Sequence, residues 1–446
     1  MVIKSLLPSA GILMLACLFF PGNAFSGIEI TLGEIGDRDD YLCWGRVPAH
    51  VQWTGTGPIP TSVTITSEAV QSPGGSIGFA NTRNSSESLR ETLEVNFDHA
   101  NGLGEFFVAG VAASIAKKDV EIVAKVPGSG LETRLPVMVR VRKDAERLTV
   151  EERDQFLLAF RDAARRNNQF AKYWGIHTDA IRMAHQVAFL PWHRLFLLNL
   201  ERELQLENPA VALPYWEFDK PAPKVFSRDF LGEIGALPNP QEVEFSPTNP
   251  LSQFKLTDPR VSPLTRLRNG SASTSPLINK AFFSETLHGP MTSGIFGPYH
   301  GAAHVFIGGL VGDIQRSPAD PVFFLLHANV DRAWAAWQRV QDRFNRTDAR
   351  AYALQGKHSS GATQIEGNFE QDTMWPWDNH ERPTEPVTIT IGQIVLPQKS
   401  GPGEEVTINP QVGDMIDYLD LSGDGATHNY CYDTVPYGLG ATQDFP

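Results

Sequence analysis

Between residues 27 and 142, short runs of the chain alternate apolar and polar side chains. The runs are Ser62–Ser67, Leu89–Phe97, Asp119–Val126 and Leu135–Arg142, and clusters such as SPGGS and PGSG separate them. Alternation with period two places every second side chain on one face of a strand, and turn residues at this spacing are typical of antiparallel sheets. The pattern predicts an antiparallel β-sandwich over residues 27–142.

After this region the apolar side chains recur every three or four residues. Thr149 and Glu152 have the spacing of a capping box, and Phe156 and Phe160 share one face of the run that follows. We therefore predict that a helical core begins here and extends over residues 143–382.

A second strong helical pattern begins at His193. Leu197, Leu200 and Leu204 recur at helical spacing and are expected to face inward. The charges of Glu201 and its two neighbours are expected to face mostly outward.

Two more helices are predicted further along. Pro298 can start the first and Gly308-Gly309 can end it, because Pro needs no amide partner and Gly tolerates positive φ. Asp320 as N-cap and Pro321 as first helical residue can start the second, which runs to about Arg343.

Loops and strands are expected to complete the core. The segment from Asn208 to about Ser284 is rich in Pro, Ser and Asn, which favours long loops, with Trp216 and Phe218 as anchors. After Arg382 the runs VTITIGQIVL and EEVTINP alternate again, as does the segment 420–433. These runs predict a short C-terminal β segment within residues 383–446.

Six histidines stand in two ordered groups within the predicted helical core. Three lie eight residues apart in HTDAIRMAHQVAFLPWHR, and three more occur in HGAAH and DPVFFLLHANVDR. Imidazole suits copper, zinc and iron, and no Cys, Asp or Glu recurs here at ligand spacing. The pattern predicts two metal ions, each with three neutral nitrogen ligands. The groups are His177, His185 and His193, and His300, His304 and His327.

The spacing of these histidines constrains the backbone. His300 and His304 stand at i and i+4 and can share one metal on a helix face. His185 and His193 lie about 80° apart around a helix of 3.6 residues per turn, and Pro191 falls between them. We therefore expect a loop-to-helix transition, with Pro191 just before or within the first turn of the helix that carries His193.

Both stretches resemble the two copper-binding regions of the tyrosinase, catechol oxidase and hemocyanin superfamily, the type 3 dicopper proteins. FLPWHR with LERELQ is similar to the first region, and HxxxH, Gly308-Gly309 and DPVFFLLHANVDR are similar to the second. The resemblance covers about residues 140–433 and implies a four-helix bundle with two copper ions, one for each histidine group. It also implies an oxidoreductase of catechol oxidase type, a polyphenol oxidase that converts o-diphenols or o-aminophenols to quinones with O2.

The resemblance carries expectations for other positions. Phe323 is expected to pack on a ligand imidazole, and Ile314 falls where the family limits access to the coppers, although a plain core position fits Ile314 nearly as well. Tyr430-Cys431-Tyr432 resembles the tyrosine motif that ends the catalytic core, with Arg142 as its expected partner. Met183 stands where fungal members have a thioether-forming cysteine, so no thioether is expected.

The chain also departs from the family pattern. The step from His185 to His193 is eight residues, where the family usually has nine. The family often has two histidines where this chain has Leu326-His327, and the one kept, next to Ala328, matches the ligand.

A further departure concerns monophenols. Members that hydroxylate them have an Asn directly after the first histidine of the second region and a Glu several residues earlier. Here Gly301 follows His300, residues 291–293 are Met, Thr and Ser, and Glu285 lies too far back. The resemblance therefore implies little hydroxylation of monophenols.

Several alternatives stay open. The same ligands occur in reversible O2-binding proteins of hemocyanin type and in true tyrosinases, because these differ in access to the site. Glu285 and His288 have the Glu-x-x-His spacing of a carboxylate di-iron bundle, but no second copy exists, so we interpret this as coincidence. The remaining histidines are interpreted as satisfied core residues: His50, His99, His358, His380 and His428.

Composition narrows the class of partner. The chain has 446 residues, of which 41% are hydrophobic and 20% charged, enough for two or three domains. Its formal net charge is -13 without a long basic run, which argues against nucleic acid or an anionic membrane surface as partner. A neutral or cationic small molecule fits this balance better, and the resemblance implies a small phenolic substrate and O2. The oligomeric state stays open.

The first 26 residues have the pattern of a secretory signal peptide. Lys4 supplies the positive charge, Leu6–Phe20 is mostly apolar but shorter than a typical membrane span, and small residues follow. We expect a secreted or periplasmic protein with no membrane segment in its mature form. Removal of the signal leaves Cys43 and Cys431, which can form a disulfide in an oxidising compartment, with buried free thiols as the alternative.

Overall fold

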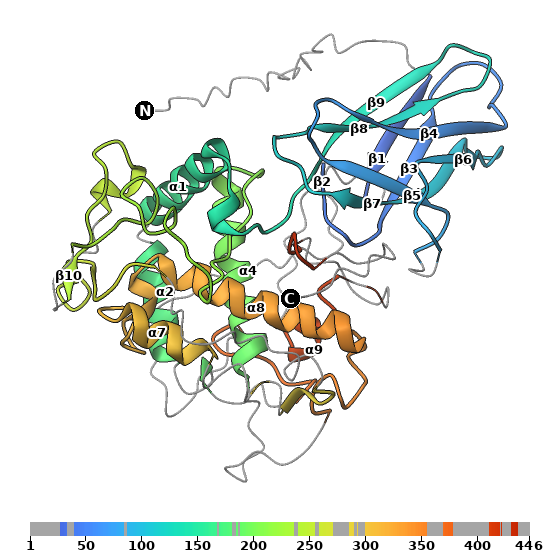
Figure 1. The fold of residues 1–446 in the computed structure, drawn as a ribbon. Coiled ribbons are helices and arrows are strands. Elements are labelled where there is room, and N and C mark those ends of the chain that lie inside the picture. Colours follow the sequence, from blue (N-terminus) through green and yellow to red (C-terminus); the bar gives the residue numbers. More distant parts are fainter. Residues whose placement is uncertain are drawn as a thin grey trace, which may run out of the picture.

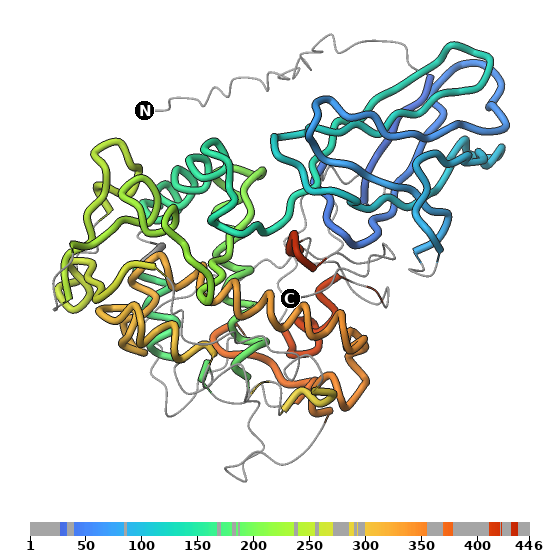
Figure 2. The backbone as a smooth tube through the Cα atoms, in the orientation of Figure 1, coloured from blue at the N-terminus to red at the C-terminus, as the bar shows by residue number. Residues whose placement is uncertain are grey.

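The structure is a computed structural model, and it places a strand-rich N-terminal part beside a helical part (Figures 1 and 2). The last described segment of the chain, shown in dark red, lies between the two parts. The described residues are 27–33, 40–83, 87–166, 169–180, 184–185, 188–235, 240–254, 258–270, 285–289, 292, 299–354, 369–377, 410–419, 421 and 430–435.

The strands of the N-terminal part form two sheets. The four-stranded sheet has the order β1-β3-β7-β5, and the five-stranded sheet has the order β2-β9-β8-β4-β6. All pairs are antiparallel except β2 with β9, which is parallel and was not predicted. The strands are β1 (Ile28–Leu32), β2 (Tyr41–Leu42), β3 (Val47–Trp53), β4 (Ser62–Ala69), β5 (Ser76–Ala80), β6 (Thr92–Asn96), β7 (Leu103–Ala112), β8 (Val120–Lys125) and β9 (Glu132–Val139).

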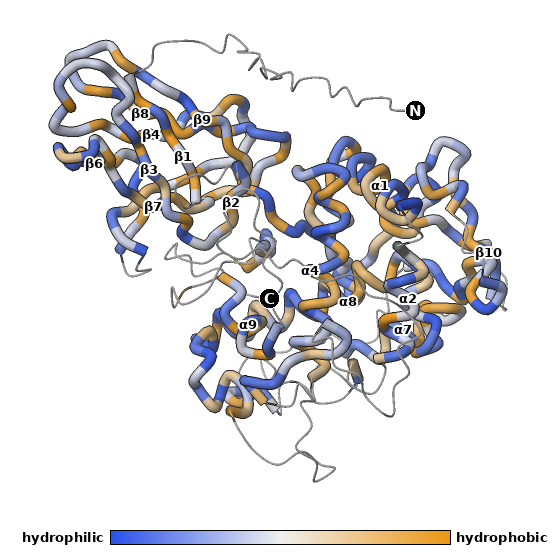
Figure 3. The backbone as a smooth tube through the Cα atoms, turned by 180° about the vertical axis from the view of Figure 1, so that it is seen from behind, coloured by the Kyte–Doolittle hydropathy of each residue, from blue (hydrophilic) through white to orange (hydrophobic). Residues whose placement is uncertain are grey.

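Each of the four alternating runs in the sequence carries one of these strands, namely β4, β6, β8 and β9. Buried and more exposed residues alternate along β1, β4 and β6, and hydrophobic and hydrophilic positions alternate in Figure 3. Val51 and Phe106 of one sheet and Ile65 and Ile122 of the other belong to the same buried apolar cluster. Period two therefore identified the buried face of β1, β6 and the first half of β4, whereas β8 and the end of β9 are buried on both faces.

The helical part is built around two long helices, α4 and α8. Helix α4 packs against α1, α8 and α9, and α1 also packs against α2. The mixed α and β fold class is confirmed. The helices are α1 (Val150–Arg165), α2 (Gln169–Asp179), α4 (Phe189–Glu207), α7 (Ala302–Ile307), α8 (Val322–Gln341) and α9 (Val412–Ile416), with short 3-10 turns η1 (Ala145–Arg147), η3 (Pro250–Gln253) and η5 (Ser317–Ala319).

The predicted start of the helical part is confirmed. The Thr149 hydroxyl accepts a hydrogen bond from the Glu152 amide, and the Glu152 carboxylate accepts one from the Thr149 amide, which completes a capping box for α1. Phe156 and Phe160 are buried. Local sequence thus specifies both the start and the inward face of α1.

Helix α4 begins at Phe189, so Pro191 lies in its first turn, as predicted. Leu197, Leu200 and Leu204 are buried, whereas Glu201 contradicts the prediction because its side chain is buried too. The Glu201 carboxylate accepts two hydrogen bonds from the Arg142 guanidinium, at 3.1 and 2.8 Å, which explains why a charge can face inward there.

The two downstream helices differ in detail from the prediction. Helix α7 begins at Ala302 and directly follows a π-helical turn over residues 299–301, so the helical segment carries both His300 and His304 as predicted, and Pro298 lies outside the described residues. Gly308 and Gly309 end α7 with φ of 62° and 58°, as expected for glycine at a helix end. Helix α8 runs over Val322–Gln341 with Pro321 at the N-cap, one residue later than predicted, and the Asp320 carboxylate accepts the Val322 amide at 3.0 Å.

The segment predicted as long loops contains a short ladder. Strand β10 (Gln241–Glu242) pairs with β11 (Thr265–Arg266), and two residues a side leave no periodic signal. Trp216 and Phe218 are buried, as expected of anchors.

The C-terminal prediction is only partly covered. The runs VTITIGQIVL and EEVTINP, with Met183 further upstream, lie outside the described residues. Within the described C-terminal residues the only regular element is α9, and Tyr432 forms an isolated bridge with Arg142, so the described portion is not a β segment. Cys43 and Cys431 form the predicted disulfide.

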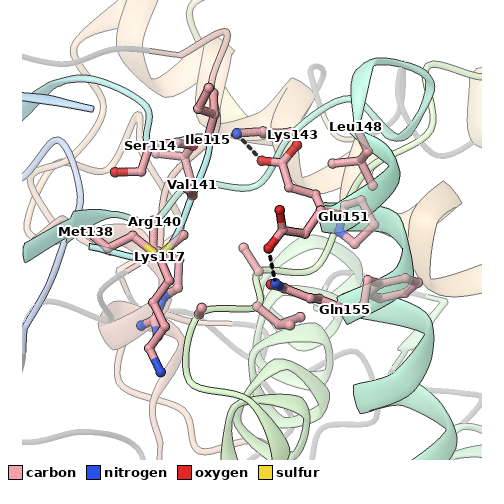
Figure 4. A pocket seen from close by; sticks show the side chains of 17 residues that line it. Ser114, Ile115, Lys117, Met138, Arg140, Val141, Lys143, Leu148, Glu151 and Gln155 are labelled. Carbon is pink, nitrogen blue, oxygen red and sulfur yellow. Dashed lines mark hydrogen bonds and ion pairs between the residues drawn. The ribbon is translucent and has the colours of Figure 1, made fainter. Parts of the chain in front are cut away.

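A small cavity lies where the two parts meet. It measures about 50 Å³ and lies between the loop after β7, the end of β9 and helix α1 (Figure 4). Lys143 pairs with Glu152, and Gln155 donates to Glu151 at its wall. The space suits a few water molecules. Among the described residues no helix is long and apolar enough to cross a membrane.

Candidate metal centre

The first group of histidines gathers at the junction of α2 and α4. His177 lies near the end of α2 and His193 in the second turn of α4, with His185 on the connection between these helices. Their ring centroids are 4.9 Å apart for His177 and His185, 5.7 Å for His177 and His193, and 5.8 Å for His185 and His193. The step of eight residues therefore still brings His185 to its partners.

The second group gathers between α7 and α8. His300 lies in the turn before α7, His304 on α7 and His327 on α8. The Nε2 atom of His327 is 3.3 Å from Nε2 of His300 and 3.2 Å from Nε2 of His304. Three ring nitrogens thus converge on one point, and in each group the candidate donor atoms lie within 4.8 Å of one another.

The two groups face each other. The rings of His193 and His327 stack with centroids 4.1 Å apart and an angle of 11° between their planes. The ring centroid of Phe323 lies 4.2 Å from that of His327 and 5.1 Å from that of His177, so this phenylalanine packs on imidazoles of both groups, as predicted. Phe189 has centroids 4.9 Å from those of His193 and His300.

Hydrogen bonds determine which ring nitrogens are available to a metal. His193 Nδ1 lies 2.9 Å from the Phe189 carbonyl and His304 Nδ1 lies 2.7 Å from the Val311 carbonyl. A carbonyl only accepts, so Nδ1 carries the hydrogen in both rings and Nε2 keeps a lone pair. Nε2 of His193 is buried and makes no hydrogen bond, which fits a metal ligand.

Burial keeps these imidazoles neutral. It lowers the pKa of His177, His193 and His327 well below the usual value, and neighbouring imidazoles lower it further. Burial also lowers the pKa of His304 to about 4. Because a metal binds the neutral ring, these four residues have the protonation state that metal binding requires at neutral pH.

A buried charge network braces the two helices that carry the stacked rings. Asp331 on α8 accepts a hydrogen bond from Arg194 Nε at 2.6 Å and one from Arg142 at 3.2 Å. The Tyr432 hydroxyl donates to Asp331 at 2.6 Å, and Arg142 donates to that hydroxyl at 2.8 Å. The predicted contact between Arg142 and the tyrosine motif is confirmed.

The remaining histidines follow several patterns. His99 is exposed, which contradicts its interpretation as a core residue. His50 is buried, but its ring nitrogens make no hydrogen bond, and the nearest carboxylate, Glu105, is 4.0 Å away. His288 is buried among the rings of Trp334, Trp337 and Tyr352, which agrees with a core residue. His358, His380 and His428 lie outside the described residues.

Sequence reasoning missed residues that support the site. Phe189 stands four residues before His193 on the same helix face, so helical spacing could have identified it. Two other supporting residues carry no local signal, because their partners are distant in sequence. The Ser317 hydroxyl lies 3.2 Å from His304 Nδ1, and Arg266 pairs with Asp320.

Comparisons with known proteins agree on one family. Residues 167–281 and 278–340 match the common central domain of tyrosinase, and this span contains all six histidines. A tyrosinase of Streptomyces antibioticus is 32% identical over 229 residues, which cover 45% of this chain and 83% of the relative. Grixazone synthase of Streptomyces griseus is 31% identical over 264 residues, covering 45% and 85% respectively.

Lower similarity is found to a hemocyanin and to a tyrosinase of known structure. Hemocyanin 1 of Megathura crenulata is 28% identical over 166 residues, which cover 35% of this chain and 5% of that protein. A solved tyrosinase of Burkholderia thailandensis aligns with a TM-score of 0.34 and 15% identity, over 64% of this chain and 72% of that one.

Proposed function

Because the chain belongs to the tyrosinase family, we propose that it is a copper-dependent oxidase that converts o-diphenols, or o-aminophenols, to quinones with O2. The observation that carries the proposal is the pair of facing histidine triads, joined by the stacked rings of His193 and His327.

Each triad is proposed to hold one copper ion. His177, His185 and His193 would bind the first, and His300, His304 and His327 the second. An all-imidazole donor set without carboxylate or thiolate suits copper. When bound, the two coppers would pass electrons from the phenol to O2.

The protein's own residues would orient the rings and keep water out. The carbonyls of Phe189 and Val311 fix which nitrogen of His193 and His304 carries the hydrogen. Phe323, which is fully buried, restricts the rotation of His177 and His327 and lowers the polarity around them. Such outer contacts typically change metal affinity 10- to 100-fold.

A substrate is proposed to enter beside His185 and His304, which are the partly exposed members of their triads. Val305, next to His304, is 71% exposed, and Ile314 is 49% exposed. The exposure of Ile314 excludes the plain core position considered for it. Ile314, which stands where the family limits access to the coppers, is proposed to contact an aromatic ring at the entrance and so limit its size.

Monophenols are proposed to be poor substrates. A monophenol must lose a proton with pKa of about 10 before its oxygen can bind a metal. Gly301, directly after His300, has no side chain that could hold a water as base. Glu285 accepts hydrogen bonds from the amides of Thr286 and Leu287, and thus caps its own loop.

The finer architecture is also a proposal. The packing of α4 against α1 and α8, and of α1 against α2, supports a four-helix-bundle core. The two sheets support a β-sandwich whose apolar faces meet.

The protein is proposed to be exported. The disulfide supports export to an oxidising compartment, and the mature N-terminus found by mass spectrometry should lie near residue 27.

One assay tests the function. Copper-loaded protein is given catechol, o-aminophenol, dopamine or tyramine while O2 uptake and quinone absorbance are followed, with His327→Ala as control. Turnover of catechol or o-aminophenol, absent in the control, supports an oxidase. Comparable rates on dopamine and tyramine without a diphenol primer would show that the protein hydroxylates monophenols. Reversible O2 binding without turnover would indicate a protein of hemocyanin type.

A further inference from the structure

We infer that the segment Thr265–Arg268, here called the strap, positions the second histidine triad, and that Arg266 is its main positioning residue. The inference rests on the proposed function, because copper affinity is its readout. The strap lies in the region that sequence patterns predicted to be loop.

The strap is bonded to the end of α7, which carries His304. The amides of Leu267 and Arg268 donate to the Ile307 carbonyl at 2.7 and 3.2 Å, and the Leu310 amide donates to the Thr265 carbonyl at 3.0 Å. The last carbonyl groups of a helix have no partner within the helix, and the first two of these hydrogen bonds satisfy the one at Ile307. The last turn of α7 is therefore held by the strap.

Two glycines allow this close approach. A Cβ on Gly308 would lie 2.3 Å from the Leu267 side chain, and one on Gly309 would lie 2.1 Å from the Thr265 carbonyl oxygen. The turn that they form leads to Val311, whose carbonyl accepts the Nδ1 hydrogen of His304 at 2.7 Å. The strap thus sets the place of the carbonyl that orients His304.

The same strap is bonded to the start of α8, which carries His327. Arg266 Nε and a terminal nitrogen donate to the two carboxylate oxygens of Asp320 at 2.7 and 2.8 Å, and both side chains are fully buried. Asp320 in turn accepts the Val322 amide through its side chain and the Phe323 amide through its backbone, each at 3.0 Å. Arg266 therefore fixes the first turn of α8, which carries Phe323 and leads directly into the turn that carries His327.

Arg266 has further partners that anchor it. Its guanidinium also donates to the carbonyls of Gly232 and Leu231 at 3.1 and 2.9 Å. A lysine could not reproduce this fork of donors, because its ammonium is a point charge. The geometry thus depends on arginine.

The consequence is an asymmetry between the two triads. His304 and His327, two of the three imidazoles of the second triad, are placed by elements that the strap joins. The first triad is carried by α2, α4 and the connection between them. Loss of the strap contacts should weaken copper binding at the second triad by on the order of 10- to 100-fold and leave the first unchanged.

The test needs a variant that changes the position of the second triad without lowering the stability of the fold. Arg266→Met alone leaves Asp320 as a buried unpaired charge and destabilises the fold, whereas the double variant Arg266→Met with Asp320→Asn removes both charges. The side-chain oxygen of asparagine can still accept the Val322 amide, as the Asp320 carboxylate does. The double variant should therefore recover most of the stability of the copper-free protein, but not the copper affinity of the second triad.

Affinity is measured by equilibrium dialysis against a copper chelator in the full chain. In the His193→Ala background, which isolates the second triad, the double variant should bind copper 10- to 100-fold more weakly. In the His327→Ala background, which isolates the first, it should bind copper unchanged. Arg346→Met with Glu370→Gln is the control, because it likewise removes both charges of an ion pair, which are 2.7 Å apart, and should affect stability alone.

The outcomes separate this inference from the proposed function. A wild type that binds two coppers, with a double variant that binds both as tightly, overturns the inference and leaves the function standing. Equal weakening at both triads also overturns it, because Arg266 would then act only through general stability. A wild type that binds no copper overturns the proposed function and the inference with it.

Discussion

Replacing Asp331 by asparagine, a side chain of nearly the same size, should strongly lower the stability of the fold. The side chain is 2% exposed and lies between Arg194, Arg142 and the Tyr432 hydroxyl. Asparagine keeps the shape but removes the charge. Arg142 retains Glu201, whereas Arg194 retains only neutral partners such as the Met415 carbonyl at 2.6 Å.

The magnitude follows from burial. Breaking a buried ion pair by neutralising one partner costs about 3 to 5 kcal/mol, because the other charge stays desolvated. This is a large share of the roughly 5 to 15 kcal/mol that keeps a typical protein folded. At roughly 2 to 4 °C per kcal/mol for a domain of this size, the melting temperature should fall by about 6 to 20 °C.

The assay is unfolding of the copper-free protein by urea and by heat, so that metal binding does not contribute. Asp313→Asn is the matched control. Its partner Arg316 is at 2.9 Å, but the two side chains are 35% and 43% exposed, so water already screens the pair. The control should lose less than about 1 kcal/mol.

The double variant Arg194→Met with Asp331→Asn also removes the arginine that is left without a counter-charge. It should therefore be more stable than Asp331→Asn alone. A loss below 1 kcal/mol in Asp331→Asn, or a double variant less stable than the single one, would refute the assignment of Asp331 as the charge that joins α4, α8 and the C-terminal segment.

Three further predictions can be checked independently. Replacing His193 or His327 by alanine should leave about one copper per chain by metal analysis, and retention of two would contradict the ligand assignment. Replacing Cys43 and Cys431 by alanine opens a loop of 388 residues and should destabilise the protein by about 6 kcal/mol in the chain-entropy model. Urea unfolding measures this loss, and no change would mean that the disulfide does not constrain the unfolded chain. Burial lowers the pKa of His288 to about 3, so its contribution to stability should be complete above pH 6.5 and fall by up to about 5 kcal/mol as pH decreases toward 3. His288→Gln should flatten this part of the stability profile, and an unchanged profile would show that His288 is not its source.

Local signals predicted the elements well where one segment carries all the information. The capping box of Thr149 and Glu152 starts α1, Pro191 falls in the first turn of α4, and Gly308 and Gly309 end α7. Each depends on backbone hydrogen bonds within a few residues, which composition and spacing can encode.

Prediction was less successful where burial depends on distant partners. Glu201 was expected to face outward, since a charge on a helix is usually solvated, but Arg142 from 59 residues earlier makes its burial possible. His99, interpreted as a core residue, is exposed. Neither position carries a local pattern that distinguishes the two environments.

The sequence by itself determined which residues could form the site: six histidines of suitable type in two ordered groups, with helical spacing for His300 and His304. Only the tertiary structure decided that the groups face each other, that His185 joins its triad despite the step of eight, and that Phe189 and Phe323 lie on imidazoles of both groups. It alone also connected Arg266 to Asp320, 54 residues apart, and so the strap to the second triad. The physical reason is that residue type and local spacing specify chemistry and helix faces, whereas the approach of segments distant in sequence depends on how the whole core packs.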